Sequence, residues 1–331
     1  MEIYESRRSR RLRLEREKRK RNRRKIQQIG LIFLAIFFVV LMILLFSKTE
    51  NSDEKAETKI PEQKQTRTEK KKEKKPLPSS NIQNNLQAKI DELNGNLGLP
   101  KNVFANDLPG NAATSVAIID LSDKKRGNVD FNGNLQFTSA STYKVFVAYS
   151  MIREIETGKR SWLSALGNST FDICLQRMIV NSDNVCPETY LARAGFSKIN
   201  AQIHEELGMS DQTQIKVNDM RTTANDLALL FKKFYSGELM SAENQQKLID
   251  LMKKQTFRQG IPAGILAQIN NKIENEGTTV ADKVGFMNAL LSDAGIVYSD
   301  KGDYVLVIMT NGESWEFIAQ LTAWINQQMN S

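Results

Sequence analysis

The pattern of apolar and polar residues over the C-terminal three quarters of the chain predicts strands at both ends of this region. The run 115–121 reads as a buried strand, and Asn132-Gly133 reads as a turn ahead of a second strand, so we expect a hairpin. Two further short runs, 294–298 and 304–309, are rich in β-branched residues and are separated by a polar turn. We therefore expect strands from both ends of this region to join in one sheet.

Helical periodicity dominates the middle of this region. The expected helices span 145–158, 162–209 with a polar break at 181–184, 223–237, and 315–329. The first is apolar on nearly all sides and stops at Gly158, which predicts a buried helix. The third begins at Thr223, with Asp226 as the capping-box acid, and ends near Gly237.

This order of elements predicts an α+β fold for a domain at 81–331. Its antiparallel sheet is flanked by helices, and an all-helical lobe at about 145–248 is inserted into the sheet lobe. A domain of about 250 residues is long enough for two lobes that share a cleft. We expect the functional site in that cleft.

The N-terminal 80 residues have a different character. Residues 1–28 form a basic tail, with thirteen Lys and Arg against four acidic residues among the first 25. The next segment, 29–47, contains eighteen uncharged, mostly apolar residues, which make a helix about 27 Å long against a hydrocarbon core of about 30 Å. We predict one transmembrane anchor with a cytoplasmic N-terminus and an extracytoplasmic domain, since basic residues precede the span.

Two alternatives to the anchor are a cleaved signal peptide and a basic arm that binds nucleic acid. No small-residue cleavage site follows the apolar run, which argues against the first. The whole basic excess lies in residues 1–80, and residues 81–331 carry a net charge of −4, so we expect no nucleic-acid partner. Residues 48–80 are charged and lack large apolar side chains, which predicts a disordered linker or a Glu/Lys-rich helical stalk.

Cys174 and Cys186 are the only cysteines, too few for a disulfide scaffold or a thiolate zinc site. They form either one bridge or two buried thiols. We expect no metal and no cofactor.

Candidate chemistry centres on Ser141 and Lys144. A lysine three residues after a serine on a helix shares its face, which suits a nucleophile and its base. The same spacing recurs at Ser52 and Ser122, but only Ser141 is followed by a buried helix. The single histidine, His204, lies on an expected helix surface, which makes Ser-His-Asp catalysis improbable.

Lys144 acts as a base only if its amine is neutral, whereas the ordinary pKa of lysine is about 10.4. We expect burial and the positive charge of Lys283 to lower the pKa of Lys144 to about 7–8.

Three short motifs occur in a fixed order: Ser-Thr-Tyr-Lys at 141–144, Ser-Asp-Asn at 182–184 and Lys-Val-Gly at 283–285. They resemble the three motifs of class A β-lactamases and penicillin-binding proteins. Segments around 221–227 and 293–297 also resemble this superfamily, and the similarity covers about residues 90–331. It implies the β-lactamase/D,D-peptidase-like fold.

The resemblance also implies the roles of the site residues. Ser141 is acylated, Lys144 accepts its proton, and Ser182 relays a proton to the leaving nitrogen. Asn184 holds the amide side chain of the substrate, and Lys283 supplies positive potential for a substrate carboxylate.

The resemblance further implies that Gly285 keeps its strand open to the substrate. The main-chain N–H groups of Ser141 and Phe286 form the oxyanion hole.

Two departures from the family pattern stand out. Val284 replaces the usual threonine or serine, so a hydroxyl that bonds the substrate carboxylate is missing unless Arg258 or Asn288 compensates. No glutamate occurs between Leu207 and Leu230, where class A enzymes carry the glutamate that activates the deacylating water.

We therefore expect a membrane-anchored extracytoplasmic serine hydrolase that forms an acyl-enzyme with a β-lactam or a related cell-wall amide. One alternative is a penicillin-binding D,D-carboxypeptidase or transpeptidase that acts on peptidoglycan peptides and releases β-lactams slowly. The other is a catalytically weak binding module of the cell envelope.

Overall fold

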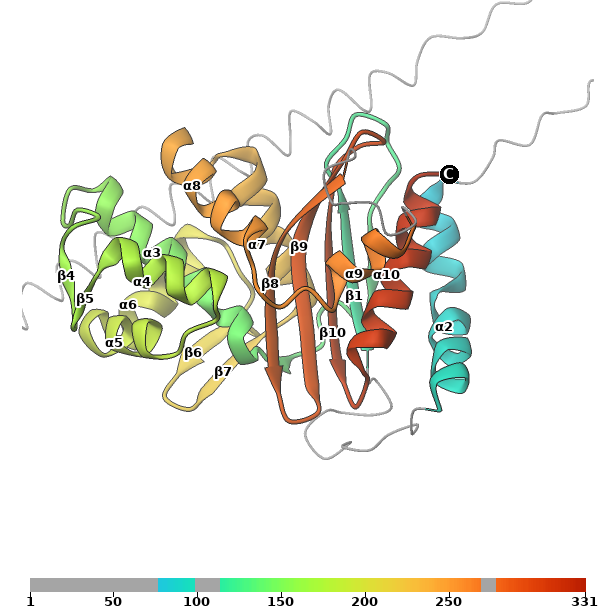
Figure 1. The fold of residues 1–331 in the computed structure, drawn as a ribbon, viewed down its shortest axis with the longest axis horizontal. Helices are drawn as coiled ribbons and strands as arrows, with labels where there is room; N and C mark the ends of the chain where they lie inside the picture. The colour runs from blue at the N-terminus through green and yellow to red at the C-terminus, as the bar shows by residue number, and fades with distance from the viewer. Residues whose placement is uncertain (1–76, 99–113, 269–277) are drawn as a thin grey trace, which may run out of the picture. The chain divides into compact units, whose positions relative to one another are not determined.

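A five-stranded antiparallel sheet forms the centre of the protein in the computed structural model, which describes residues 77–98, 114–268 and 278–331 (Figure 1). The strand order is β2-β1-β10-β9-β8, so the first and last strands of the domain meet in the middle and β8 is an edge strand. The strands are β1 (Thr114–Asp120), β2 (Val129–Phe131), β8 (Thr278–Met287), β9 (Leu290–Ser299) and β10 (Tyr304–Asn311).

Both faces of the sheet are buried. On β10, Val305 and Val307 pack into one apolar core while Leu306 and Ile308 pack into a second core on the opposite face. Burial on both faces explains why the last strands are continuous apolar runs rather than alternating ones. The second core is covered by α2 (Pro78–Leu97), α9 (Ile261–Gln268) and α10 (Trp315–Met329).

The first core lies between the sheet and the inserted lobe. α7 (Ala224–Ser236) packs against β1, β9 and β10, whereas the helix at 242–253 and the turn at 140–143 pack against β8 (Figure 1). The lobe contains η1 (Ala140–Tyr143), α3 (Lys144–Glu156), α4 (Phe171–Val180), α5 (Val185–Ala194), α6 (Phe196–Ala201), a π-helical turn (Gln202–Glu206) and α8 (Ala242–Lys253).

The helices with strong local signals lie where the sequence predicts them. The hydroxyl of Thr223 accepts a hydrogen bond from the Asp226 N–H at 3.1 Å, and α7 ends at Gly237 with φ of +76°. The predicted helix at 315–329 is α10, and the predicted strands at 294–298 and 304–309 lie within β9 and β10.

Three expectations were wrong in part. The hairpin partner of β1 is β2, which precedes the Asn132-Gly133 turn, whereas the strand after that turn, β3 (Phe137–Thr138), pairs with β7 (Asp219–Thr222). The physical reason is that the chain already reverses between β1 and β2. A buried ion pair between Asp120 and Arg126, with an N–O distance of 2.8 Å, stabilises this reversal.

The lobe is also not entirely helical. β6 (Gln214–Lys216) forms a hairpin with β7, and β4 (Ala165–Leu166) forms one with β5 (Ser169–Thr170). Their turns contain Asn218 at φ +56° and Gly167 at φ +59°, a backbone conformation that favours reversal over helix continuation.

The first helix begins at Pro78, so residues 78–80, which we assigned to the linker, belong to α2. The tail 1–28, the anchor 29–47 and the linker up to residue 76 lie outside the described residues. Among the described helices, none combines the length and the apolar character required to cross a membrane.

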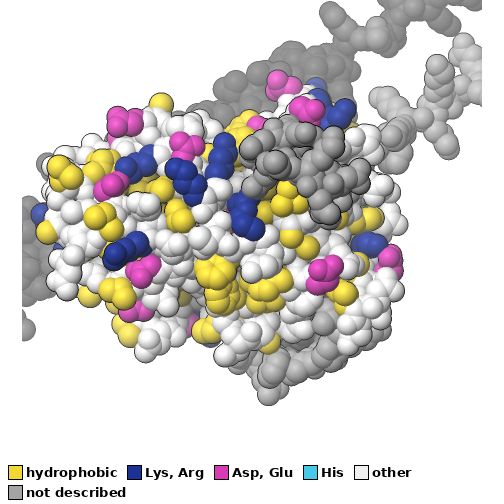
Figure 2. All heavy atoms as spheres, viewed as in Figure 1, with side chains coloured by type: hydrophobic (Ala, Val, Ile, Leu, Met, Phe, Trp, Pro, Cys, Tyr) yellow, Lys and Arg dark blue, Asp and Glu magenta, His cyan; other side chains and the backbone are white. Residues whose placement is uncertain are grey.

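Charges of both signs are interspersed over the face of the protein drawn in Figure 2.

Candidate active site

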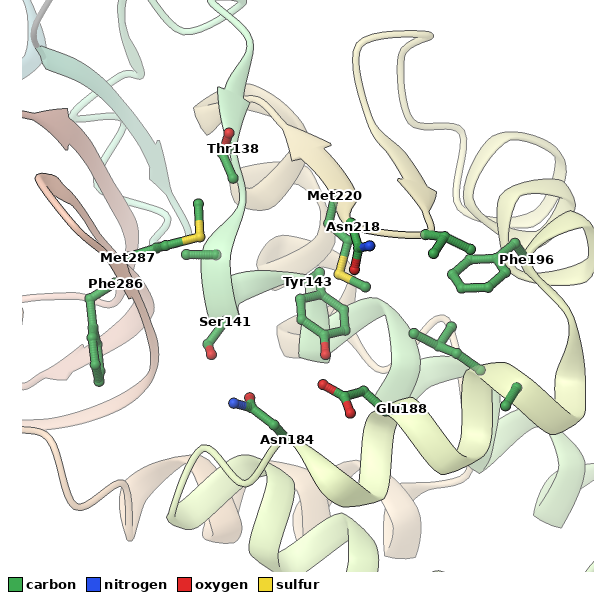
Figure 3. A pocket seen from close by; sticks show the side chains of 14 residues that line it. Thr138, Ser141, Tyr143, Asn184, Glu188, Phe196, Asn218, Met220, Phe286 and Met287 are labelled. Atoms are coloured by element: carbon green, nitrogen blue, oxygen red, sulfur yellow. The ribbon is translucent and has the colours of Figure 1, made fainter. Parts of the chain in front are cut away.

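Ser141 lies in the single turn η1, immediately before the buried helix α3, and lines a cavity of about 510 Å³ (Figure 3). The preceding residue, Ala140, has φ of +43°, which is a strained conformation for a residue with a Cβ atom. The Thr142 hydroxyl donates a hydrogen bond to Ser139 O at 2.6 Å and fixes the turn. The strained turn therefore presents Ser141 to the cavity.

Lys144 is fully buried and its ammonium nitrogen touches three groups of the site. Nζ donates to Ser141 Oγ at 2.9 Å, to Asn184 Oδ1 at 2.6 Å and to the Ser182 carbonyl at 2.5 Å. Burial lowers the pKa of Lys144 to about 8, although the negative charges of Asp183 and Glu188 oppose the shift. A substantial fraction of this amine is therefore neutral near pH 8, as a base for Ser141 requires.

Lys283 approaches Ser182 from β8. Its Nζ donates to Ser182 Oγ at 2.9 Å and to Val284 O at 2.7 Å. Burial, and next the charge of Lys144, lower the pKa of Lys283 to about 7. We expected the repulsion to act on Lys144, but it acts on Lys283 and adds to the lowering of its pKa.

Ser182 connects the two lysines. Lys144 Nζ lies 3.3 Å from Ser182 Oγ, and the backbone of Ser182 has φ of +57° at the polar break between α4 and α5. The structure thus brings together all five expected side chains, which come from η1, α3, the α4–α5 loop and β8: Ser141, Lys144, Ser182, Asn184 and Lys283.

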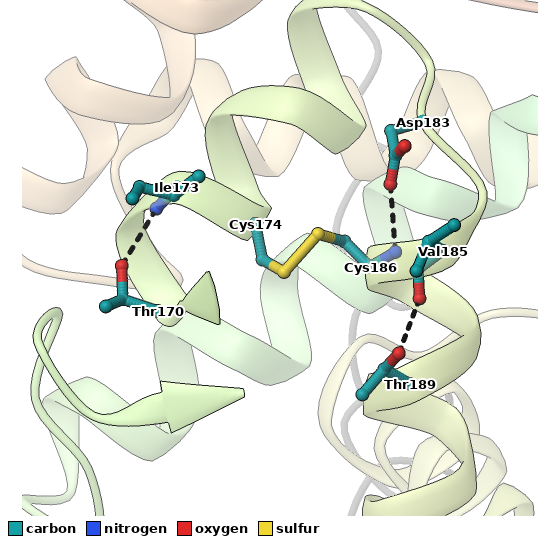
Figure 4. Close-up of a disulfide and its surroundings, with 7 residues drawn as sticks. All are labelled: Thr170, Ile173, Cys174, Asp183, Val185, Cys186 and Thr189. Atoms are coloured by element: carbon teal, nitrogen blue, oxygen red, sulfur yellow. Dashed lines mark hydrogen bonds between the residues drawn. A yellow bond between two sulfur atoms is a disulfide. The ribbon is translucent and has the colours of Figure 1, made fainter. Parts of the chain in front are cut away.

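The cysteines are joined by a disulfide, which answers the question that the sequence left open (Figure 4). The bond connects Cys174 of α4 to Cys186 in the first turn of α5, with a Cα–Cα distance of 5.2 Å. The Cys186 N–H also donates to Asp183 Oδ1 at 2.9 Å. Both interactions flank the loop that carries Ser182 and Asn184, so they hold that loop in place.

Gly285 lies where β8 crosses η1, the turn that carries Ser141. A Cβ atom added there would meet Ser139 O at 2.8 Å and Thr142 Cγ2 at 2.9 Å, so only glycine fits without displacement. The next residue, Phe286, exposes 44% of its side chain and lines the cavity. Its predicted role rests on the main-chain N–H and stays a prediction.

Val284 faces away from the cavity. Strand alternation places Val284 and Asp282 on the face of the sheet opposite the cavity. Val284 pairs in register with Asp293 of β9, and its side chain is fully buried. Arg258 lies on that face too, with Nη1 2.8 Å from Asp282 Oδ1. Val284 and Arg258 do not line the described cavity.

The two carboxyl groups beneath β8 share this buried environment. Burial, and next the neighbouring charge of Asp293, raise the pKa of Asp282 well above its ordinary value. Burial also raises the pKa of Asp293 to about 6, while the Ile261 N–H donates to Asp293 Oδ2 at 2.8 Å. Both carboxyl groups are therefore harder to ionise than exposed aspartates.

The cavity contains a carboxyl group that the motifs did not identify. Glu188, in the first turn of α5, points into the cavity beside Tyr143 and Asn184 (Figure 3). Its position four residues after Asn184, on the same helical face, is the sequence signal that identifies it. His204 is half-buried on the π-helical turn, with Nδ1 3.3 Å from Met209 O, and does not line the cavity.

A family model described as "Beta-lactamase enzyme family" matches residues 101–329, which is more than half of the chain. The chain belongs to this β-lactamase family. No curated protein sequence matches it significantly.

Solved structures of β-lactamases and of a penicillin-binding protein share the fold. A mutant of PBP-A, solved as an acyl-enzyme complex with penicillin G, is 22% identical, with a TM-score of 0.59 over 74% of this chain and 96% of that chain. A β-lactamase from Sphaerobacter thermophilus is 17% identical, with a TM-score of 0.58 over 74% and 94% of the two chains. One from Burkholderia phymatum is 15% identical, with a TM-score of 0.60 over 75% and 99%.

Family membership makes this protein a serine hydrolase of the β-lactamase-like type. The contacts among Ser141, Lys144 and Ser182 are those that acyl transfer requires, because nucleophile, base and proton relay form one hydrogen-bonded chain. The individual roles of the site residues remain predictions.

Proposed function

We propose that the enzyme forms an acyl-enzyme at Ser141 with β-lactams or related cell-wall amides. The observation that carries this proposal is the contact at 2.9 Å between Ser141 Oγ and the fully buried Nζ of Lys144. A serine next to a neutral amine is an activated nucleophile, whereas a serine next to an ordinary lysine is not.

The acylation step follows from these contacts. Neutral Lys144 takes the proton of Ser141 as Oγ attacks the carbonyl carbon of the substrate. The main-chain N–H groups of Ser141 and Phe286 hold the developing oxyanion. As the C–N bond breaks, Ser182 Oγ gives its proton to the nitrogen and takes the Ser141 proton from Lys144, which becomes neutral again. Lys283 Nζ holds Ser182 Oγ in place.

We also propose that the domain is extracytoplasmic and anchored in the membrane by residues 29–47. The basic residues before this apolar segment support the orientation. The Cys174–Cys186 disulfide supports the compartment, since structural disulfides persist in oxidising environments.

A second candidate is a D,D-carboxypeptidase or transpeptidase that acts on peptidoglycan stem peptides. Two observations favour it: PBP-A is similar in fold, and no glutamate lies between Leu207 and Leu230. In this function β-lactams acylate Ser141 but leave slowly.

One experiment separates these functions. The purified full-length chain is incubated with a fluorescent penicillin and, separately, with a chromogenic cephalosporin. Rapid turnover indicates a β-lactamase, and stable labelling without turnover indicates a penicillin-binding peptidase.

Ser141→Ala should abolish both signals. Ser122→Ala is the matched control, since Ser122 has the same spacing to a lysine but does not line the cavity. Labelling or turnover that survives in Ser141→Ala, or a wild type that shows neither labelling nor turnover, would refute the proposal.

A further inference from the structure

The active-site cavity holds one acidic side chain among its described lining residues, and the acylation step does not use it. Glu188 lies on α5, and its N–H donates to Asn184 O at 3.2 Å, so the two residues are one helical turn apart on one face. Asn184 in turn contacts Lys144 Nζ at 2.6 Å. Glu188 is therefore held one turn from a residue that touches the base of the nucleophile.

Figure 3 shows the direction of the Glu188 side chain. Its carboxyl group points into the cavity between the hydroxyl end of Tyr143 and the side chain of Asn184, and Ser141 faces the same space. The side chain is exposed to solvent, so water reaches it from the cavity. Its negative charge raises the pKa values of both Lys144 and Tyr143.

We propose that Glu188 is the general base that activates water to hydrolyse the Ser141 acyl-enzyme. This inference rests on the proposed function, because it needs an acyl group on Ser141. It supplies from α5 the carboxyl group that the segment 207–230 does not contribute as glutamate.

The hydrolytic step balances as follows. Glu188 accepts one proton from water while the water oxygen bonds to the acyl carbon. The proton on Glu188 passes through solvent to Lys144, which is neutral after acylation. The bond from that carbon to Ser141 Oγ then breaks, and Oγ takes this proton from Lys144 Nζ. Lys144 is again neutral and Glu188 again ionised, so one water is consumed and one carboxylic acid is released.

A merely structural role for Glu188 makes a different prediction. If its charge only orients Tyr143 or Lys144, removal should change acylation, because both residues adjoin the nucleophile. If Glu188 activates water, removal should spare acylation and prolong the acyl-enzyme. The two rates must therefore be measured separately.

The test uses the full-length chain, penicillin G and intact-protein mass spectrometry, which follows the formation and the decay of the acyl-enzyme. In Glu188→Gln we expect acylation within about threefold of wild type and decay slowed by at least about 100-fold, the usual contribution of a general base. Glu205→Gln, which removes an exposed glutamate outside the cavity lining, should leave both rates unchanged.

Chemical rescue provides an independent measurement. Formate should restore decay in Glu188→Ala, because the small carboxylate enters the space left by the side chain, whereas chloride at equal ionic strength should not. A decay rate in Glu188→Gln equal to that of wild type overturns the role of Glu188 while the proposed function stands.

Equal slowing of acylation and decay in Glu188→Gln also overturns the inference, because it assigns Glu188 to positioning. If penicillin G does not acylate the wild type, the proposed function itself fails, and the inference fails with it.

Discussion

The pH dependence of acylation should depend on whether the substrate carries a carboxylate. Lys144 must be neutral to accept the proton of Ser141, and the pKa of Lys144 is about 8. Lys283 must be protonated to attract a carboxylate, and its pKa is about 7. The two requirements act in opposite directions as the pH changes.

The magnitude follows from these pKa values. A change of the lysine pKa from 10.5 to about 8 favours the neutral amine by about 3 kcal/mol. At pH 7 about 10% of Lys144 is then neutral, against roughly 0.03% for an ordinary lysine, a gain of about 300-fold. For penicillin G, we expect the second-order acylation constant to peak between pH 7 and 8 and to fall about tenfold per pH unit on both sides.

The assay measures this constant from pH 5.5 to 9.5 for penicillin G and for its methyl ester, with spontaneous hydrolysis subtracted. The ester lacks the charge that Lys283 attracts, so its profile should rise through about pH 8 and then stay level. Lys144→Arg should reduce acylation of both compounds by at least about 100-fold, because arginine stays protonated. A flat profile, or a descending limb for the ester as well, would refute the assigned roles of the two lysines.

Three further predictions concern the support of the site. Gly285→Ala should lower the acylation rate at least tenfold and the free energy of unfolding by about 1–3 kcal/mol, since its Cβ meets a main-chain oxygen at the turn that carries Ser141; Gly95→Ala, in open space on α2, is the control, and equal effects of the two would contradict the packing argument. Replacing Cys174 and Cys186 together by serine should lower the free energy of unfolding in urea by about 3 kcal/mol, the usual contribution of a loop of this length, and an unchanged urea midpoint would count against the bridge. Asp282→Asn should reduce the pH dependence of the free energy of unfolding. The raised pKa of Asp282 gives the wild type stability that is fully present below about pH 4 and is lost as the pH rises through the folded pKa. The loss of stability between pH 4.5 and 7 should therefore be smaller in the variant.

Local signals in the sequence predicted the elements that flank the site. Thr223 and Gly237 specify the ends of α7 because capping depends on residues within one turn. The apolar run after Lys144 specified a buried helix because nearly all of its faces carry apolar side chains. The three motifs also identified five side chains that the structure places in mutual contact or one contact apart.

Contacts between distant residues were less predictable. Strand pairing put β1 beside β2 rather than beside the strand after Asn132, because a polar turn marks a reversal without identifying the partner. Side chains alternate along β8, and this alternation places Val284 on the face of the sheet that is turned away from the cavity. The position at which the family carries a hydroxyl is therefore on that far face. The motifs did not predict Glu188 as a site residue, because none of them contains it and only the packing of α5 directs it into the cavity.

The sequence by itself determined the order of the motifs and predicted a nucleophile and its base, because these depend on residue identity and on spacing within a helix. Only the tertiary structure decided the electrostatics of the site. Lys144 and Lys283 are 139 residues apart in the chain, and their shifted pKa values arise only when folding buries both beside Ser182. Desolvation and charge repulsion depend on distances across the cleft, and no local pattern of residues fixes those distances.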